Sequence, residues 1–320
     1  MQKVLIVGGG IGGVTLAGFL TRRLPEVQVH VAEQTEQWAP LGAGISLTGN
    51  ALRQLAELGL SSALERQGVL LKGVRMANLK GKVLSKSDTL RQAGDRDAFT
   101  AKVLSIHRAT LHRTLMTACD DVQFHLGTRP TSIEQDDDGV TVVLNNGESE
   151  VSDRFDLVIG ADGVHSAVRS SVVEAPAKTN SHFRYAGYTC WRSIVSMPES
   201  ELSRAATSWE FWGRGKRFGF IPMVEGTVYF YCCANAGAND PAYQNLERSD
   251  LLALFSEFPR SVREVLSALD PADRIHHDDL GDVTLDSWSR GRIVLIGDAA
   301  HATTPNMGQG AALAIEDSSV

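Results

Sequence analysis

The chain has 320 residues, of which 43% are hydrophobic and 22% are charged, as in an ordinary globular protein long enough for two domains. Its formal net charge of −7 argues against nucleic acid or an anionic membrane as a partner. No apolar run approaches the length of a membrane span and no cysteines form a C-x-x-C pair, so we expect a cytoplasmic protein with reduced thiols.

The first predicted element is a buried strand over residues 3–7, KVLIV, which runs directly into glycines. Gly8, Gly10 and Gly13 have the spacing G-x-G-x-x-G. In that motif the glycines permit a tight turn, the approach of a pyrophosphate and close packing of the next helix, in that order. We expect the helix over residues 14–23, with its N-terminal N–H groups favouring an anion.

A second strand is predicted over residues 27–33, VQVHVAE. It ends at Glu33, 20 residues after Gly13, where a carboxylate can accept hydrogen bonds from both hydroxyls of a ribose. Strand, glycines, helix and acid together predict a bound dinucleotide, which on this motif alone is either FAD or NAD(P).

Two later strands also end in motifs of interest. The strand over 157–159 ends in Asp162-Gly163, with Ser166 and Arg169 following on a short expected helix. Near the end of the chain, RIVLIGDAA predicts a buried strand that ends at Asp298, where a carboxylate can bind polyol hydroxyls. PNMGQG then presents backbone N–H groups at the start of a helix, a place that favours negative charge.

The three motifs in this order and spacing resemble the group A FAD-dependent monooxygenases, the aromatic hydroxylase family, over essentially the whole chain. The resemblance implies an α/β fold. Its parts are a three-layer, Rossmann-like FAD-binding domain and an inserted substrate domain on a mostly antiparallel sheet. It places the FAD-binding domain at residues 1–72, 100–178 and 281–320, and the substrate domain at residues 73–99 and 179–280. Aromatic and β-branched runs between residues 205 and 233 suit such a sheet.

The resemblance also assigns roles to single residues. Glu33 resembles the ribose ligand, Arg108 an arginine on a helix that faces FAD, and Asp298 the ligand of the ribityl chain. The loop LGAGIS (41–46) resembles the segment whose backbone passes the flavin ring, and Pro130 matches a position near adenine. The full set of expected cofactor-binding residues is Gly8, Gly10, Ile11, Gly12, Gly13, Glu33, Gln34, Gly44, Ser46, Arg108, Pro130, Asp162, Asp298, Gly308, Gln309, Gly310, Ala311 and Ala312.

The function that the resemblance implies is NAD(P)H-consuming hydroxylation of a small aromatic or N-heteroaromatic substrate through a flavin C4a-hydroperoxide. FAD is then the resident cofactor, NADPH or NADH is a transient reductant, and O2 is the second substrate. The hydroperoxide is electrophilic, so the protein has to exclude water, position the substrate and favour its electron-rich anion. We expect no metal site, no nucleic acid, no membrane span, and a monomer or a homodimer.

Arg217 and Tyr229 are the expected catalytic residues. They resemble an Arg–Tyr pair at the same spacing in FAD-dependent urate hydroxylases, the subgroup nearest in pattern, where the pair holds the purine anion. An arginine fork suits an anionic heteroaromatic. Whether the two side chains share a face depends on strand register. The alternative is that Arg217 is a surface residue of a hairpin and Tyr229 is an aromatic residue of the core. Cys190 stands where that subgroup has an asparagine, and a thiol cannot replace the hydrogen bonds of an amide.

Other polar residues are expected to be structural. His301 is interpreted as a structural imidazole, and the run His276-His277-Asp278-Asp279 as a solvated strand, because adjacent side chains on a strand point to opposite faces.

Two alternative functions stay open. One is an FAD reductase or a polyene epoxidase on the same fold. The other follows from the C-terminus: the relatives continue beyond the helix in which this sequence ends, so the chain is also readable as a truncated fragment that binds FAD weakly.

Overall fold

A computed structural model describes residues 2–38, 43–88, 102–174 and 182–319 of the chain. Its central feature is a six-stranded sheet in which every neighbouring pair except β18–β19 is parallel. The strand order β18-β19-β12-β1-β2-β8 corresponds to Ser289–Arg290, Ile293–Leu295, Leu157–Gly160, Lys3–Val7, Gln28–Ala32 and Gln123–His125.

Strand β1 shows why the sheet is covered on both faces. Val4 and Ile6 belong to one buried cluster and Leu5 and Val7 to another, as expected for side chains that alternate along a strand. The first cluster lies under the helices α1 (Ile11–Arg23), α2 (Gly49–Glu57), α3 (Ser61–Gln67), α4 (Arg108–Met116) and α10 (Gly310–Asp317). The continuous apolar run predicted this double burial.

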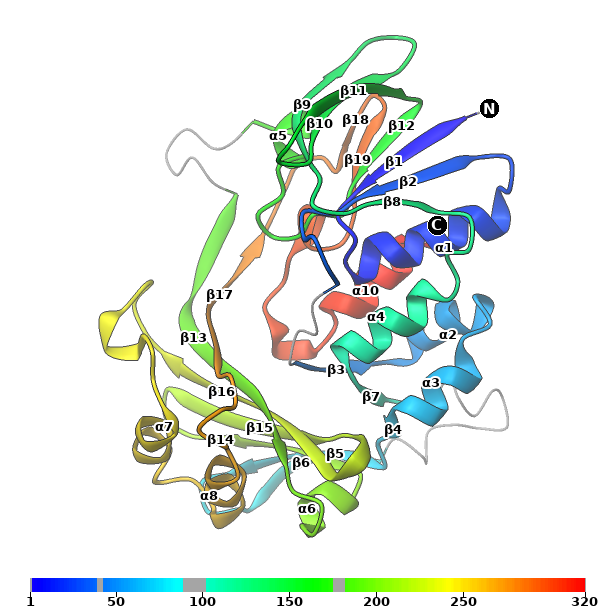
Figure 1. Ribbon diagram of the computed structural model, residues 1–320. Coiled ribbons are helices and arrows are strands. Elements are labelled where there is room, and N and C mark those ends of the chain that lie inside the picture. Colours follow the sequence, from blue (N-terminus) through cyan, green and yellow to red (C-terminus); the bar gives the residue numbers. More distant parts are fainter. Residues whose placement is uncertain (1, 39–42, 89–101, 175–181, 320) are drawn as a thin grey trace.

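The second cluster lies under an antiparallel sheet of order β11-β10-β9, formed by Glu150–Phe155, Val140–Asn145 and Arg129–Gln135. The short helices α5 (Arg169–Val172) and α9 (Asp298–His301) complete this side. Helices, parallel sheet and antiparallel sheet thus form three layers, visible in the upper part of Figure 1, so the predicted fold class is confirmed.

A seven-stranded sheet occupies the lower part of Figure 1. Its order β17-β13-β16-β15-β14-β5-β6 corresponds to His276–Val283, Phe183–Ser196, Thr227–Asn235, Lys216–Pro222, Thr207–Trp212, Gly73–Asn78 and Val83–Ser87. Only the pair β14–β5 is parallel, so the sheet is mostly antiparallel, as expected. The helices α7 (Arg248–Leu254) and α8 (Arg260–Ser267) cover one face of this sheet, and a third buried cluster lies between them and the strands. Helix α6 (Glu201–Arg204) lies at one end of the sheet.

A small sheet lies between these two parts in Figure 1, with the order β3-β7-β4 and the residues Gly44–Leu47, Leu104–His107 and Val69–Leu70. Three-residue 3₁₀ turns at Val224–Gly226, Pro241–Tyr243 and Pro305–Met307 (η1, η2 and η3) and strand connections complete the described chain. The expected domain limits stay a prediction, and residues 89–99 and the limits at 100 and 178 lie outside the described residues.

One helix boundary differs from the sequence-based expectation. Helix α1 begins at Ile11 rather than at residue 14, so Gly12 and Gly13 lie in its first turn. Helix α7 begins at Arg248 with a capping box, in which the N–H of Glu247 donates to the Asp250 carboxylate at 2.9 Å.

Candidate functional site

The glycine loop after β1 leaves space at one glycine and none at the other two. A β-carbon on Gly8 would come within 2.4 Å of the Ala161 carbonyl oxygen, and one on Gly13 within 2.0 Å of the Gly8 carbonyl oxygen. At Gly10 no atom lies within 4 Å of the β-carbon position. Gly8 and Gly13 are therefore required by the packing of the loop itself, whereas Gly10 faces open space of the kind that a pyrophosphate needs.

The N-terminus of α1 is electrostatically suited to an anion. Gly10 is its N-cap, no side chain caps the helix, and its first turn carries no acidic residue. The first backbone N–H groups are thus left for an external acceptor, at the positive end of the helix dipole. Ile11 is buried in the core and Gly12 lies against Ala314 of α10, with a distance of 3.3 Å from its β-carbon position.

Glu33 follows β2 and lies against the glycine loop. One of its carboxylate oxygens accepts from the Gly9 N–H at 2.8 Å and the other from the Thr35 N–H at 2.9 Å. The carboxylate is thereby fixed beside the expected pyrophosphate position and retains further lone pairs for ribose hydroxyls. Gln34 is exposed.

Two residues near this loop were missed from the sequence. The Nε2 of His112 donates to the Gly9 carbonyl oxygen at 2.7 Å, and the His112 ring lies 4.8 Å from the ring of Trp38. His112 stands one turn after Arg108 on α4, and this i, i+4 spacing is the signal that places both on one helix face.

Pro130 lies in β9, opposite Leu144 of β10, at a register irregularity. Thr128, two residues before it, donates its N–H to the Glu33 carbonyl oxygen at 2.8 Å. The chain segment that leads to Pro130 is therefore adjacent to the end of β2, on the adenosine side of the predicted site.

The Asp162-Gly163 loop and the Gly297-Asp298 loop are joined by Arg169. Its buried guanidinium donates to the carbonyl oxygens of Val164 and Ala299 at 2.9 Å each, and to that of Asp298 at 3.2 Å. Two of the three predicted motifs are thus brought together by a residue that follows one of them.

The Asp162 carboxylate acts within its own loop. It accepts from the Ser166 hydroxyl at 2.5 Å and from the Ala167 N–H at 2.7 Å. Ser166 precedes α5 rather than lying on it, and its hydroxyl oxygen accepts from the Arg169 N–H at 3.0 Å.

Asp298, Arg108 and Gly310 come together from three elements. The Asp298 carboxylate lies 3.9 Å from the β-carbon position of Gly310, at the start of α10. Its side chain is open to solvent, yet desolvation by the protein around it raises the pKa of its carboxyl, while the nearby charge of Arg108 acts in the opposite direction. A carboxylate, a guanidinium and a helix N-terminus therefore face one region.

The start of α10 is fixed from the other side by α2. Gly308 adopts φ +62°, a left-handed conformation that favours glycine, and the Gln309 amide nitrogen donates to the Thr48 hydroxyl at 3.1 Å. Ala312 is fully buried in the core and Ala311 packs against it, so these two offer only their backbone.

His301 is held in a structural pair, as interpreted from the sequence. Its Nε2 lies 2.7 Å from the Asp317 carboxylate, which also accepts from the Gly297 N–H at 2.8 Å. The hydrogen bond with Asp317 raises the pKa of His301. Asp317 thus connects the end of α10 to the Gly297-Asp298 loop, a contact that the sequence did not reveal.

Strand register places Arg217 and Tyr229 on the same face of the seven-stranded sheet. Arg217 of β15 is opposite Cys233 of β16, and Tyr229 is opposite Ile221. Positions 229 and 233 are four apart on one strand, so their side chains point to the same side. Tyr231 lies between them, so Arg217 and Tyr229 share a face without being neighbours.

Arg217 connects this face to the loop before α10. Its guanidinium donates to the Asn306 side-chain oxygen at 2.5 Å and lies 5.3 Å from the ring of Tyr188, whose hydroxyl donates to the same oxygen at 2.8 Å. Asn306 belongs to η3, next to the expected flavin-facing residues. The seven-stranded sheet and the predicted cofactor site therefore meet at Arg217.

A buried carboxylate that the sequence did not reveal balances Arg217. Glu210 of β14 lies 3.8 Å from the Arg217 guanidinium and accepts hydrogen bonds from the Tyr231 hydroxyl and the Trp212 ring nitrogen. Arg217 is thus preoriented between Glu210 and Asn306.

Tyr229 packs against the backbone of β3 so closely that no side chain fits at Gly44. It is buried, and this burial raises the pKa of its phenol. Gly44 and Ser46 belong to β3, whereas Leu41 and Gly42 of the same loop lie outside the described residues.

The cysteines of this sheet are buried free thiols. Cys190 is opposite Cys233 and lies on the Arg217 face.

The run His276–Asp279 is the strand β17, as expected, but its side chains are bonded rather than simply solvated. His277 stacks on Trp191 with ring centroids 5.2 Å apart, and Asp278 forms an ion pair with Arg192. Among the described residues no group of three metal-binding side chains exists, and no helix is long and apolar enough to cross a membrane.

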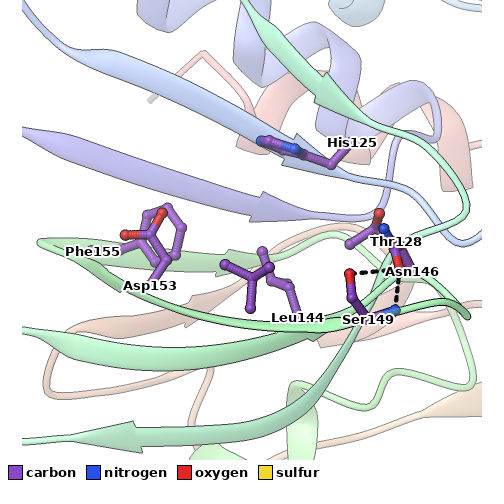
Figure 2. Close-up of a pocket in the computed structure, with 8 residues that line it drawn as sticks. His125, Thr128, Leu144, Asn146, Ser149, Asp153 and Phe155 are labelled. Atoms are coloured by element: carbon purple, nitrogen blue, oxygen red, sulfur yellow. Dashed lines mark hydrogen bonds between the residues drawn. The ribbon is translucent and has the colours of Figure 1, made fainter.

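A pocket of about 230 Å³ lies elsewhere, between β8 and the hairpin β10–β11 (Figure 2). His125, Asp153 and Phe155 line it, and His125 stacks on His30 with a ring separation of 5.3 Å. None of the predicted site residues lines this pocket, so it is separate from the region around Asp298.

Known proteins resemble this chain in sequence and in fold. The family described as "FAD binding domain" matches residues 1–320. Aurachin C monooxygenase/isomerase of Stigmatella aurantiaca is 34% identical over 318 residues, which cover 99% of this chain and 79% of the relative. 3-Amino-4-hydroxybenzoate 2-monooxygenase of Streptomyces cremeus is 33% identical over 323 residues, which cover 98% of this chain and 76% of the relative.

Solved structures include HpxO of Klebsiella pneumoniae complexed with FAD and uric acid. It superposes with a TM-score of 0.84 at 30% identity, and the match covers 99% of this chain and 78% of that one.

Proposed function

This chain belongs to the FAD binding domain family and is a flavin-dependent monooxygenase, and we propose that it uses NADPH or NADH to hydroxylate a small aromatic or N-heteroaromatic substrate. One observation carries the proposal: the sheet face with Arg217 and Tyr229 contacts the predicted flavin site at two places, Asn306 and Gly44. A ring lying on this face would be next to the flavin.

The cofactor site in the proposal consists of the residues described above. Gly10 and the N-terminus of α1 would receive the pyrophosphate, Glu33 the ribose, and Asp298 the ribityl chain. Arg108 and the start of α10 would lie beside the flavin ring. The open space at Gly10 and the uncapped helix support this assignment.

Bound FAD supplies the electron transfer and oxygen activation. The contribution of the chain is to position and polarise the substrate. Arg217 would favour the anionic, electron-rich form of the ring, and Tyr229 would orient it by a hydrogen bond. The buried carboxylate of Glu210, which accepts a hydrogen bond from Tyr231, would keep the guanidinium in place and limit water.

Two observations bear on which ring the site would bind. The uric acid complex of HpxO supports a purine-like ring, whereas Cys190 offers no amide to such a ring. We therefore favour an anionic aromatic or heteroaromatic other than urate itself. The buried free thiols support our expectation of a reducing, cytoplasmic location, and we retain the expectation of a monomer or a homodimer.

The test is a screen of NADPH and NADH oxidation by the FAD-loaded protein with aromatic acids, purines and pyridines. Oxygenated product has to be measured together with reductant consumption. We expect product with at least one anionic ring, and reductant oxidation without any oxygenated product would instead indicate an FAD reductase. Product from a polyene but from no aromatic ring would indicate an epoxidase.

A further inference from the structure

Arg192 lies on the same sheet face as Arg217 and Tyr229. It is in β13, opposite Tyr231 of β16 and opposite His276 of β17. Its neighbour Trp191 points to the other face and is fully buried in the core beneath α7 and α8. Strand alternation therefore presents Arg192 to the region that we propose for the substrate.

One nitrogen of the Arg192 guanidinium has no partner. An Nη atom forms an ion pair with Asp278, while Nε is buried and makes no hydrogen bond among the described residues. A buried donor without an acceptor is unfavourable, and a ligand oxygen that reaches it removes this cost. A carboxylate oxygen at Nε would accept a charge-assisted hydrogen bond, which is stronger than a neutral one.

The surroundings of Arg192 favour an anion. Desolvation by burial lowers the pKa of Arg108 on α4, and the charge of Arg192 acts in the same direction. Tyr229 interacts electrostatically with both arginines. The acids on the sheet side are already paired, Asp278 with Arg192 and Glu210 with Arg217.

The spacing of Arg192 and Arg217 suits the two ends of one small molecule. β16 lies between their strands, and they stand at neighbouring rows, opposite Tyr231 and Cys233. Strand spacing and rise then separate their Cα atoms by roughly 10–12 Å. Between them lies Tyr231, whose ring covers Gly219, so a substrate ring would lie over the tyrosine rather than on the bare sheet.

We propose that Arg192 is a second substrate anchor, whose unpartnered Nε binds a carboxylate oxygen at the end of the aromatic substrate opposite the end held by Arg217. The inference rests on the proposed function, because it assumes that the substrate lies on this sheet face. It makes Arg192 a specificity-determining residue that selects aromatic acids over their neutral analogues.

The experiment compares an acid with its amide. 3-Amino-4-hydroxybenzoate and 3-amino-4-hydroxybenzamide are titrated into the FAD-loaded protein, and binding is followed by the change in flavin absorbance. The wild type should bind the acid more tightly than the amide by roughly 30-fold or more, since loss of one partner of a buried charge pair has an effect of this size. Arg192→Gln should abolish the preference by weakening the acid alone, with unchanged FAD content.

Two variants separate anchoring from a structural role. Arg192→Lys keeps the charge without the fork, so it should retain part of the preference if it folds as the wild type does. Arg184→Gln is the matched control, because Arg184 is on the same strand and pairs with Asp282 of β17, but its side chain is 78% exposed. It should leave both affinities unchanged.

Three results would overturn the inference: a wild type that binds neither compound, one that binds acid and amide equally, or an Arg192→Gln variant that weakens both equally. The proposed function is judged separately, by oxygenated product. If the wild type hydroxylates neutral rings and Arg192→Gln does the same, the anchor is wrong and the function stands. If the acid preference depends on Arg192 but no substrate is oxygenated, the anchor stands and the function fails.

Discussion

Gly44 lies directly against Tyr229: a β-carbon at residue 44 would come within 2.5 Å of both Cβ and Cγ of the tyrosine. This contact joins β3, which carries the expected flavin-facing backbone, to β16 of the seven-stranded sheet. Because the approach is set by backbone on one side and by a buried ring on the other, neither partner can yield without moving its strand.

Gly44→Ala should therefore push β3 and β16 apart. We expect a loss of about 1–3 kcal/mol in the free energy of unfolding, the usual cost of overpacking, and a lower yield of product per NAD(P)H. Gly237→Ala is the control, since nothing lies within 4 Å of its β-carbon position. Denaturant unfolding of both variants is the measurement, and a Gly44→Ala protein as stable as Gly237→Ala would show that the contact is not close.

Gly10→Val and Gly13→Ala should fail in different ways. Gly10 has φ −72° and ψ −173°, which valine tolerates, and its β-carbon position is open, so the valine variant should fold normally but purify without flavin. The alanine at residue 13 would clash with the Gly8 carbonyl oxygen and should destabilise the protein even without FAD. Flavin absorbance and apoprotein melting temperature distinguish the two. Full flavin content in Gly10→Val would exclude the pyrophosphate from this loop.

Asp298→Ala should weaken FAD binding by about 1–3 kcal/mol, the cost of leaving hydrogen-bond donors of the cofactor unpaired. Asp298→Asn should lose less, because an amide oxygen still accepts. Titration of apoprotein with FAD gives the affinities. Wild-type affinity in the alanine variant would remove Asp298 from the cofactor site.

The free energy of unfolding at acid pH should depend on His30. Its ring is buried and stacks on His125 beside the pocket in Figure 2, and desolvation lowers the pKa of His30 from 6.5 to about 4, with Lys3 and His125 adding to the shift. The unfolded chain binds the proton more readily than the folded one. The free energy of unfolding is therefore unaffected by His30 above pH 6.5, and it decreases as the pH falls towards about 4.

This decrease in the free energy of unfolding should reach roughly 3 kcal/mol. His30→Gln cannot be protonated and should flatten the pH dependence of unfolding across this window, while His165→Gln, at an exposed histidine, should follow the wild type. Equal slopes for the wild type and His30→Gln would contradict the assignment.

The sequence predicted those parts of the molecule that depend on local pattern. The strand over residues 3–7 and the glycine spacing that follows it predicted the loop geometry at Gly8 and Gly13. The sequence could not show whether Arg217 and Tyr229 share a face of the sheet. A shift of one residue in strand register moves a side chain to the other face, and no local feature sets that register.

Contacts between distant segments could not be predicted. Arg169 reaches the carbonyl of Ala299, Asp317 holds Gly297 and His301, and Glu210 balances Arg217. Each pairing depends on the tertiary arrangement of separate elements. Arg192 could have been predicted from the sequence, because it lies two residues from Cys190 on the same strand and therefore on the same face.

The most direct test of the account is the fate of labelled oxygen in the wild type and in Arg217→Gln. FAD-loaded protein is supplied with NAD(P)H, 18O2 and an aromatic substrate from the screen, and labelled product is measured against reductant oxidised. We predict one 18O atom in each product molecule. Arg217→Gln should keep its FAD and continue to oxidise NAD(P)H, while its hydroxylation step loses about 2–4 kcal/mol of transition-state stabilisation. Unlabelled product, or equal coupling in the two proteins, would contradict the placement of the substrate at Arg217 beside the flavin.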